Sequence, residues 1–332
     1  MPPADEQLTK DISVSSQARA ILEASDIDSS GARFHQITGG ISSTTFAAHL
    51  PSGGVIVKQA LEQLDVAEEW KASPTRVVAE AEGLTWFSAL TPQHVPRPIA
   101  VVEHLYGLVL PMAPQPSPDM RTVLVENPRD FNLGWPRLLG EILALWHGAD
   151  YRPALGSALD DTSRLVDLRL EPFYLDIAQK WPEQTIKIKE LAAELLTVKS
   201  TVVHGDFTPK NVLCLPDGNI WIVDTEVCHI GNPVLDSASM LAHLILKGFL
   251  YRRDPEMTQV LHLSRNQFLD ALPEPSTPDS LAAHVGVFLA VRAAGRARVP
   301  YLSEATKQDV IEMAQALLDG ASLEEGCQQW LT

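Results

Sequence analysis

The sequence is poor in cysteine and in long apolar runs. Its 332 residues include three cysteines, which are far apart and form no C-x-x-C pair. This spacing argues against a disulfide framework and against a zinc site, and it fits a protein of a reducing compartment. The longest apolar stretches, such as Leu281–Val291, fall well short of the roughly 20 residues of a membrane span. The start of the chain is polar and acidic and carries no signal-peptide pattern, so we expect a cytoplasmic protein.

Basic residues are also scarce. Lys and Arg number 26 against 42 Asp and Glu, which gives a net charge of −16. A surface this acidic repels phosphate backbones and anionic lipid, which argues against nucleic acid and membranes as partners. It tolerates a cationic or neutral substrate, or an anion delivered with Mg²⁺. The simpler explanation of the charge is solubility alone.

The composition, with 45% apolar and 20% charged residues, is that of a globular protein. The length suffices for two lobes, because a single core rarely grows beyond ~250–300 residues. A proline-rich stretch from Ala113 to Pro128 is the best candidate for a boundary between them. We therefore expect one domain over residues 1–112, with a loose tail over 1–15, and a second domain over residues 113–332.

The two parts differ in their patterning. The first has short apolar runs separated by turn-forming Gly and Pro, which predicts β-strands, and one helix. The second has helical spacing interrupted by a small β island at 202–223. The expected fold class is α+β, with a small antiparallel β lobe followed by a mostly helical lobe. The expected strands are Phe34–Ile37, Thr45–Leu50, Val55–Gln59, Pro96–Val102 and Leu105–Leu110, and the expected helices are Ser16–Ser25, Thr75–Leu90, Trp135–His147, Lys187–Thr197, Ser237–Leu250, Ser280–Ala297 and Glu304–Leu318.

The β island reads as a hairpin, because Asp217-Gly218 lies between two short apolar runs. If these two residues form the turn, or if Pro216–Asn219 forms a four-residue loop, Asn211 lies directly opposite Asp224, at the ~4.5–5.5 Å separation of paired Cβ atoms. A carboxylate and an amide oxygen this close can share one hard cation such as Mg²⁺. Glu226 returns to the same side if the chain stays extended, so it is a third candidate ligand.

Asp206 precedes Asn211 in the pattern H-x-D-x-x-x-x-N. This spacing is that of phosphoryl-transfer catalytic loops, in which the Asp accepts the proton of the substrate hydroxyl and the Asn holds Mg²⁺. An ordinary hairpin with turn-forming Asp and Asn is the alternative. The presence of Asp224 and Glu226 at the matching end of the hairpin favours the catalytic interpretation.

These motifs, HGDFTPKN followed by VDTE, resemble those of the aminoglycoside phosphotransferase/choline kinase superfamily, whose members phosphorylate small molecules. The resemblance extends from about residue 34 to 302. It implies a protein-kinase-like bilobal fold, ATP and Mg²⁺ as cofactors, nucleotide binding by residues 1–112, and catalysis and substrate binding by residues 113–332. The acceptor is then a small molecule with a hydroxyl group.

The resemblance also implies roles for residues of the first part. Lys58 matches the lysine that contacts the ATP α- and β-phosphates, and Glu80 matches the glutamate that pairs with it. The remaining nucleotide-binding candidates are Gly39, Gly40, Ser42 and Ser43 in the turn that covers the phosphates, and Met112 and Ala113 at the hinge beside adenine. In the second part, Asp236 matches an aspartate that braces the catalytic loop, and His204 orients the same loop.

Several stretches resemble the methylthioribose kinase branch: VKQALEQLDVAEEWKASPTRVVAEAEGL from Val57 to Leu84, the D-T-E of the metal motif, and VRAAGRARVPYL near the end. The last of these makes Arg292 a candidate substrate contact, with pairing to a protein carboxylate as the alternative. We expect a sugar-like or otherwise polyhydroxylated acceptor. Two other functions stay open: an antibiotic-resistance phosphotransferase for aminoglycosides, and a non-catalytic pseudokinase that binds nucleotide.

Overall fold

The computed structural model describes residues 16–331 except 39, 66–69, 275–276 and 278. The chain divides into two compact units, Met1–Pro114 and Gln115–Thr332. The division falls inside the proline-rich stretch noted in the sequence.

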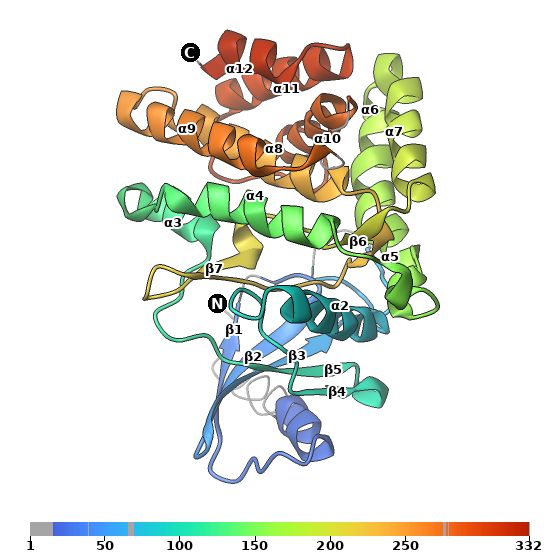
Figure 1. Ribbon diagram of the computed structural model, residues 1–332, viewed down its shortest axis with the longest axis vertical. Coiled ribbons are helices and arrows are strands. Elements are labelled where there is room, and N and C mark those ends of the chain that lie inside the picture. Colours follow the sequence, from blue (N-terminus) through green and yellow to red (C-terminus); the bar gives the residue numbers. More distant parts are fainter. Residues whose placement is uncertain (1–15, 39, 66–69, 275–276, 278, 332) are drawn as a thin grey trace, which may run out of the picture. The chain divides into compact units, whose positions relative to one another are not determined.

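The first unit contains a five-stranded antiparallel sheet with strand order β1-β2-β3-β5-β4 (Figure 1). Its strands are β1 (Arg33–Ile37), β2 (Ser43–Leu50), β3 (Gly53–Ala60), β4 (Ala100–Val102) and β5 (Gly107–Pro111). The fourth strand is shorter than expected, because Pro96 and Pro98 have no backbone N–H to give to a neighbouring strand.

Strand alternation divides the sheet of the first unit into two faces. Phe46 and Val57, which are register partners, face a helix over residues 16–24 and form a core with its buried Ile21. Lys58 follows Val57 and therefore points to the opposite face. There, helix α2 (Arg76–Leu90) supplies Glu80, whose carboxylate meets Lys58 on this face.

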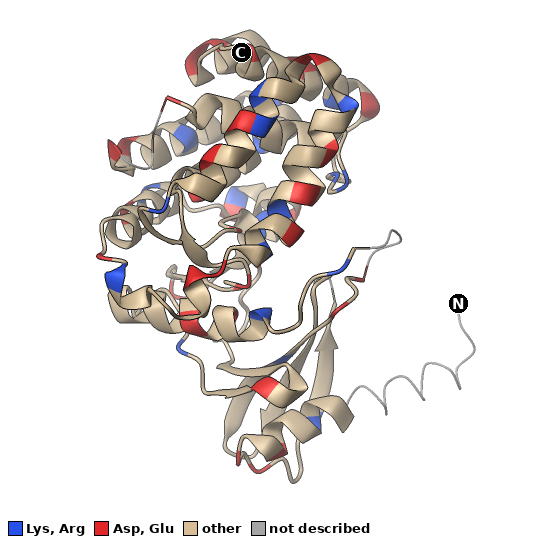
Figure 2. Cartoon of the chain, turned by 90° about the vertical axis from the view of Figure 1, so that its right-hand side faces the viewer, with Lys and Arg blue, Asp and Glu red and all other residues tan. Residues whose placement is uncertain are grey.

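The second unit is mostly helical and contains two small β ribbons (Figure 1). Its helices are α3 (Met120–Glu126), α4 (Gly134–His147), α5 (Ser163–Leu165), a π-helix at Val166–Leu175, α6 (Asp176–Lys180), α7 (Thr185–Thr197), α8 (Val234–Tyr251), α9 (Pro255–Ala271), α10 (Leu281–Ala293), α11 (Glu304–Leu318) and α12 (Leu323–Leu331). Its strands are β6 (Thr201–Val203), paired with β9 (His229–Gly231), and β7 (Val212–Cys214), paired with β8 (Ile220–Ile222). The predicted α+β fold class is confirmed. Figure 2 shows that acidic residues are spread over many of these helices and interleaved with Lys and Arg.

Helix α10 ends four residues earlier than expected, at Ala293. The N–H of Gly295 turns back to the carbonyl groups of Ala290 and Val291, and the chain leaves the helix before Arg296. The early end matters because it separates Arg292, on the helix, from Arg298, on the segment that follows it.

Helix α8 is the core helix of the second unit. Among the described residues it is the one helix long and apolar enough to cross a membrane, and 89% of that stretch is buried inside the protein. It nevertheless carries Asp236, His243 and Lys247, all of them buried. Charged and imidazole groups are costly to bury without partners. The groups around these three side chains therefore indicate which of them have a structural role and which could bind a ligand.

Helices α4 and α9 pack so closely at Gly140 that no side chain fits there. A Cβ atom at this position would lie 2.6 Å from the Cβ of Ala271 and 2.8 Å from the backbone oxygen of Phe268. Replacing a helical Gly by Ala can gain up to about 1 kcal/mol of stability, whereas over-packing costs about 1–3 kcal/mol. Because the clash is with backbone, which cannot move aside easily, we expect a larger side chain at Gly140 to lower the stability.

We therefore expect Gly140→Val to lower the free energy of unfolding by about 1–3 kcal/mol in urea denaturation. Leu145→Ala, at a position 60% exposed on the same helix, is the control and should change it by less than about 0.5 kcal/mol. Equal stability of Gly140→Val and the wild type would show that α9 is not seated against α4 at this point.

Candidate active site

The loop from His204 to Asn211 joins β6 to β7 and presents Asp206, which is 4% exposed. Aromatic rings pack against the loop: His204 stacks on Trp146, and Phe207 contacts both rings edge-on. A 3-10 turn at Pro209–Asn211 then brings the amide of Asn211 back to the start of the loop. Packing thus fixes the backbone on either side of Asp206.

Asp236 of α8 fastens the loop by hydrogen bonds. Its Oδ2 accepts the N–H of His204 and its Oδ1 accepts the N–H of Gly205, both at 2.8 Å, and His147 Nε2 lies 3.2 Å from Oδ2. Gly205 has φ +78°, and a Cβ atom there would lie 2.5 Å from the oxygen of Val227, so only glycine fits. The arrangement directs the next residue, Asp206, out of the loop.

The carboxylate of Asp206 is surrounded by donors. Arg169 Nη2 lies 2.7 Å from Oδ1, Asn211 Nδ2 donates to Oδ2 at 2.9 Å, and Lys210 Nζ lies 3.1 Å from Oδ2. Burial raises the pKa of Asp206, but Arg169, Lys210 and Arg292 lower it more, and the net shift is strongly downward. Asp206 is therefore a fixed anion throughout the physiological pH range.

The hairpin register differs by one residue from the expected one. Val212 pairs with Ile222, and the N–H of Val223 donates to the oxygen of Asn211 at 3.0 Å, so Asn211 lies opposite Val223 and not opposite Asp224. Gly218, with φ +85°, makes the loop three residues long instead of two. A three-residue loop that ends in a left-handed glycine is a common hairpin connection, and the Asp-Gly signal did not distinguish it from a two-residue turn.

Asp224 has φ +70°, which ends the extended chain just after the ribbon. The alternation that was expected to return Glu226 to the same side therefore does not apply, and Glu226 lies in the turn that Cys228 N closes on Thr225 O at 2.9 Å. The charge of Glu226 still helps to raise the pKa of Lys210, so its role as a metal ligand stays a prediction. Asp224 still lies near Asp206, because Lys210 Nζ is 3.9 Å from Asp224 Oδ2 as well as 3.1 Å from Asp206 Oδ2. One ammonium group thus bridges two carboxylates.

The donor set at this end of the hairpin fits a hard cation. The amide nitrogen of Asn211 is engaged by the backbone oxygen and carboxylate of Asp206, both at 2.9 Å, which leaves its Oδ1 as an acceptor. Within the described ranges, no three His, Cys, Asp or Glu side chains form a metal site by themselves. Mg²⁺ commonly takes only one or two protein oxygens and completes its shell with water and phosphate, so Asn211 and Asp224 suit it.

In the first unit, Lys58 Nζ lies 2.5 Å from Glu80 Oε1, and both side chains are buried. Of the expected phosphate-covering residues, Gly39 lies outside the described residues. Gly40 lies in the connection from β1 to β2, Ser42 is buried, and Ser43 begins β2.

Arg76, which the sequence reasoning missed, fixes this connection. Its guanidinium donates to the oxygen of Ser42 and, at 2.9 Å, to the oxygen of Leu61, and it is buried. At the expected hinge, the N–H of Met112 lies 3.4 Å from Gly54 O, and Ala113 is buried. The roles of these residues toward a nucleotide stay predictions.

Arg169 and Lys210 are the other two site residues that sequence reasoning missed. Lys210 lies inside the HGDFTPKN motif, directly before Asn211, so its position next to Asp206 could have been anticipated. Arg169 comes from the π-helix and donates through Nε to Gly205 O at 2.9 Å. In VDLRLEPF it is the one basic residue, between Asp167 and Glu171, and this alternation of charged and apolar residues does not single it out.

Arg292 forms no ion pair with any carboxylate that the structure describes. Among the described residues none of the carboxylates lies within 4.0 Å of it; Nη1 donates to Ala297 O at 3.1 Å, and the guanidinium lies 5.3 Å from the ring centre of Phe173. Together with Lys210 and Tyr301 it lines a cavity of about 380 Å³. Arg292, which was predicted to contact the substrate, therefore lines the same cavity as Lys210, whose ammonium group contacts Asp206.

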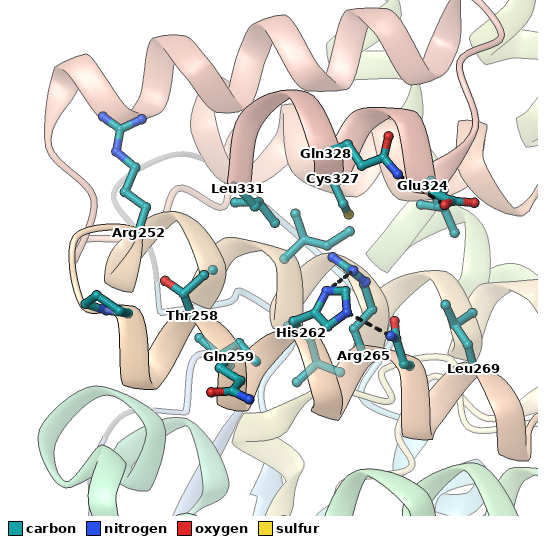
Figure 3. Close-up of a pocket in the computed structure, with 17 residues that line it drawn as sticks. Arg252, Thr258, Gln259, His262, Arg265, Leu269, Glu324, Cys327, Gln328 and Leu331 are labelled. Atoms are coloured by element: carbon teal, nitrogen blue, oxygen red, sulfur yellow. Dashed lines mark hydrogen bonds between the residues drawn. The ribbon is translucent and has the colours of Figure 1, made fainter.

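A larger cavity of about 750 Å³ lies between α8, α9 and α12 (Figure 3). It includes no residue of the catalytic loop. Its His262 is hydrogen-bonded to Arg265 at 2.9 Å and to Asn266 at 3.1 Å, so both ring nitrogens of His262 have partners within the protein. The smaller cavity is the one that belongs to the candidate site.

Comparison with solved structures shows a shared fold at low sequence identity. An amicoumacin kinase in complex with AMP-PNP and Ca²⁺ superposes with a TM-score of 0.50 and 14% identity, covering 86% of this chain and 88% of that chain. The macrolide 2′-phosphotransferase of Brachybacterium faecium has a TM-score of 0.49 and 14% identity, covering 92% of this chain and 99% of that one. An aminoglycoside phosphotransferase from Alicyclobacillus acidocaldarius has a TM-score of 0.44 and 16% identity, covering 90% of each chain.

No curated protein matches the chain in a sequence search. The phosphotransferase enzyme family matches residues 33–275, which is well over half of the chain. The match includes the sheet of the first unit, the His204–Asn211 loop and helix α8. It confirms the predicted superfamily, whereas the methylthioribose kinase branch stays a prediction. The chain belongs to the phosphotransferase enzyme family.

Proposed function

We propose that this phosphotransferase uses ATP and Mg²⁺ to phosphorylate a hydroxyl group of a small polar metabolite. Asp206 is the proton acceptor, Asn211 and Asp224 hold the metal, and Lys58 binds nucleotide phosphate. The observation that supports this most is the cluster of Asp206, Lys210, Asn211 and Asp224, in which donors converge on a carboxylate that Asp236 holds in a fixed loop.

Asp206 acts by position more than by basicity. A carboxylate whose pKa is depressed is a weak base, so it cannot remove the proton from a free alcohol ahead of the reaction. Phosphoryl transfer has a loose transition state, in which little needs to be done by covalent or proton chemistry before the phosphorus–oxygen bond breaks. Asp206 then orients the hydroxyl and accepts its proton late, when the alcohol oxygen has become acidic.

Bound Mg²⁺ would neutralise charge on the transferring phosphoryl group. Lys210 would also neutralise negative charge on the phosphoryl group, because its ammonium group lies near both Asp206 and Asp224, where charge develops during transfer. The two aspartates raise the pKa of Lys210 against the effect of burial, so it stays charged.

The acceptor is expected to be sugar-like or otherwise polyhydroxylated. Kinases of antibiotics share the fold, and one of them is the amicoumacin kinase named above, so an antibiotic is the alternative acceptor. A polycation would meet the uncompensated charge of Arg292 at the cavity, which disfavours it. A pseudokinase is disfavoured because Asp206, Asn211 and Asp224 are all present and drawn together by Lys210.

We expect Asp206→Asn to reduce kcat by roughly 10²–10⁴ while the affinity for ATP changes little, because the base is lost but no nucleotide contact is. Asp224→Ala should instead abolish the Mg²⁺ dependence of nucleotide binding. Steady-state ATP turnover and calorimetric titration with Mg-AMP-PNP separate the two effects. Wild-type turnover in both variants would contradict the proposal.

Lys58→Met should weaken nucleotide phosphate binding and lower turnover. Removing one partner of a buried ion pair can cost about 3–5 kcal/mol of stability, because it leaves the other charge unpaired. The double variant Lys58→Met/Glu80→Leu removes both charges and should recover most of the unfolding free energy without recovering turnover. If the double variant also recovers turnover, Lys58 serves stability and not nucleotide binding.

Asp236→Ala should lower the free energy of unfolding by at least about 2 kcal/mol, because two buried N–H groups lose their acceptor at about 1–3 kcal/mol each. It should also reduce kcat, since Asp206 is no longer held. Asp150→Ala, an exposed aspartate of the same unit, is the control and should change neither.

The stability difference between Asp236→Ala and the wild type should depend on pH. Burial raises the pKa of Asp236, but the hydrogen bond and charge of His147 lower it more, so the folded-state pKa lies below the ordinary 3.8. Its stabilisation is therefore fully present above about pH 4 and is lost as the pH falls below that value. Urea denaturation at several pH values tests this; a difference that vanishes between pH 8 and 5 would contradict it.

A further inference from the structure

The cavity of about 380 Å³ beside the catalytic loop has an unusual concentration of positive charge. Arg121 of α3, Lys210 of the loop, Arg292 of α10 and Arg298 of the following segment all line it, and Glu126 is the one acidic residue of the lining. The chain as a whole carries a net charge of −16, so chance placement would favour acidic residues here. A local positive field in an acidic protein attracts small anions to that spot.

Buried donors at this cavity lack protein partners. Among the residues that the structure describes, the buried Nε2 of His243, Nε of Arg292 and hydroxyl of Tyr301, all on lining residues, have no hydrogen-bond partner. Lys247, one helical turn after His243, has a fully buried Nζ without a hydrogen bond, 3.8 Å from the ring centre of Tyr301. Buried polar groups are normally satisfied, and a group of unsatisfied donors indicates an absent acceptor.

The electrostatics of Lys247 and His243 agree with this. Burial lowers the pKa of Lys247 to about 7, and the charges of Arg121 and Arg292 contribute to the decrease. Burial also lowers the pKa of His243, again with contributions from Arg292 and Lys247. Both residues therefore lie in surroundings that repel further positive charge, and an anion would relieve the repulsion.

We infer that the acceptor substrate is an anion, a hydroxyl compound whose carboxylate or phosphate group binds among Arg121, Arg292 and Arg298 while its hydroxyl group reaches Asp206. This rests on the proposed function, because it takes Asp206 as the reacting end of the site. Lys210 connects the two ends, since it lines the cavity and its Nζ lies 3.1 Å from Asp206. Guanidinium groups suit the binding of such an anion, because each can donate two parallel hydrogen bonds to a carboxylate or a phosphate group.

The size of the cavity limits the substrate. At about 380 Å³ it is near the lower end of the ~300–1,000 Å³ range of small-molecule pockets, which favours a metabolite over an antibiotic. The other source of an anionic group is the γ-phosphate of the nucleotide itself. The two sources are distinguishable, because only the second couples these arginines to nucleotide affinity.

A binding experiment tests the inference without knowledge of the substrate. Inorganic phosphate is titrated calorimetrically, at constant ionic strength, into the enzyme saturated with Mg-AMP-PNP, for the wild type and for Arg121→Gln/Arg298→Gln. Both arginines are exposed, so the variant should fold. Arg137→Gln/Arg152→Gln removes the same charge from exposed positions elsewhere on the unit and is the matched control.

We expect the wild type and the control to bind phosphate, and Arg121→Gln/Arg298→Gln to bind it at least tenfold more weakly with the same affinity for AMP-PNP. Equal phosphate binding in all three proteins, or none in the wild type, overturns the inference. A loss of AMP-PNP affinity in Arg121→Gln/Arg298→Gln also overturns it, by assigning the arginines to the nucleotide.

A second arm compares acceptors in matched pairs: glycerol with glycerate, ribose with ribose 5-phosphate, and serinol with serine, with kanamycin as a polycation. We expect the acidic member of at least one pair to be phosphorylated with a kcat/KM at least 10-fold above its neutral partner, and this preference to disappear in Arg121→Gln/Arg298→Gln. Preference for neutral or polycationic acceptors overturns the inference and leaves the proposed kinase activity standing. If none of the acceptors is turned over, the binding arm decides alone. Failure of the proposed function itself is separate: it shows as absent Mg-AMP-PNP binding in the wild type, or as nucleotide binding without transfer to any acceptor, whereas the phosphate titration tests the anion site in either case.

Discussion

The carboxylate of Asp236 is the interaction on which the candidate site depends. Its two oxygens accept the successive N–H groups of His204 and Gly205, which fixes the backbone of the loop at Gly205, where glycine allows the positive φ. Asp236 is itself fixed because it lies on the core helix α8 and has no exposed surface. A charged group in the core of the second unit thereby places Asp206, and through the short 3-10 turn it also places Asn211. The geometry of the candidate site thus depends on the packing of a helix.

The electrostatics of the site follow from the same placement. Asp206 is aimed at Arg169 and Lys210, and these two cations together with Arg292 more than offset the effect of burial on its pKa. A free buried carboxylate would take up a proton and lose its ability to accept one. The cations therefore keep Asp206 competent, and they make it a weak base. Such a group suits a reaction in which orientation and charge neutralisation carry most of the acceleration.

Most of the fold and the centre of the site could be predicted from the sequence, because they depend on local patterns. The strands of the first unit follow alternation, and alternation also puts Lys58 on the face opposite Val57. Asp206 and Asn211 lie on a short motif whose spacing has a chemical reason. The hairpin register could not be predicted, because it depends on the left-handed conformation of Gly218, and Asp-Gly is compatible with both loop lengths.

Residues that act over long sequence separations were the ones missed. Arg169 reaches Gly205 and Asp206 from a π-helix 36 residues before Gly205, and Arg76 reaches Ser42 from 34 residues away. Neither lies in a motif, and an arginine within an apolar pattern does not show what it binds. The same holds for His243, Lys247 and Tyr301, whose unsatisfied donors become visible only when α8 and the segment after α10 are packed together.

We propose that the γ-phosphoryl group passes directly from ATP to the acceptor hydroxyl, with Asp206 as proton acceptor and without a phosphorylated enzyme intermediate. The stereochemical course of transfer from ATP made chiral at the γ-phosphorus tests this most directly. A single in-line displacement inverts the configuration at phosphorus, and the account predicts inversion. Retention would mean two successive displacements through a phosphorylated enzyme residue, and it would contradict the role of Asp206 as a proton acceptor in a direct transfer.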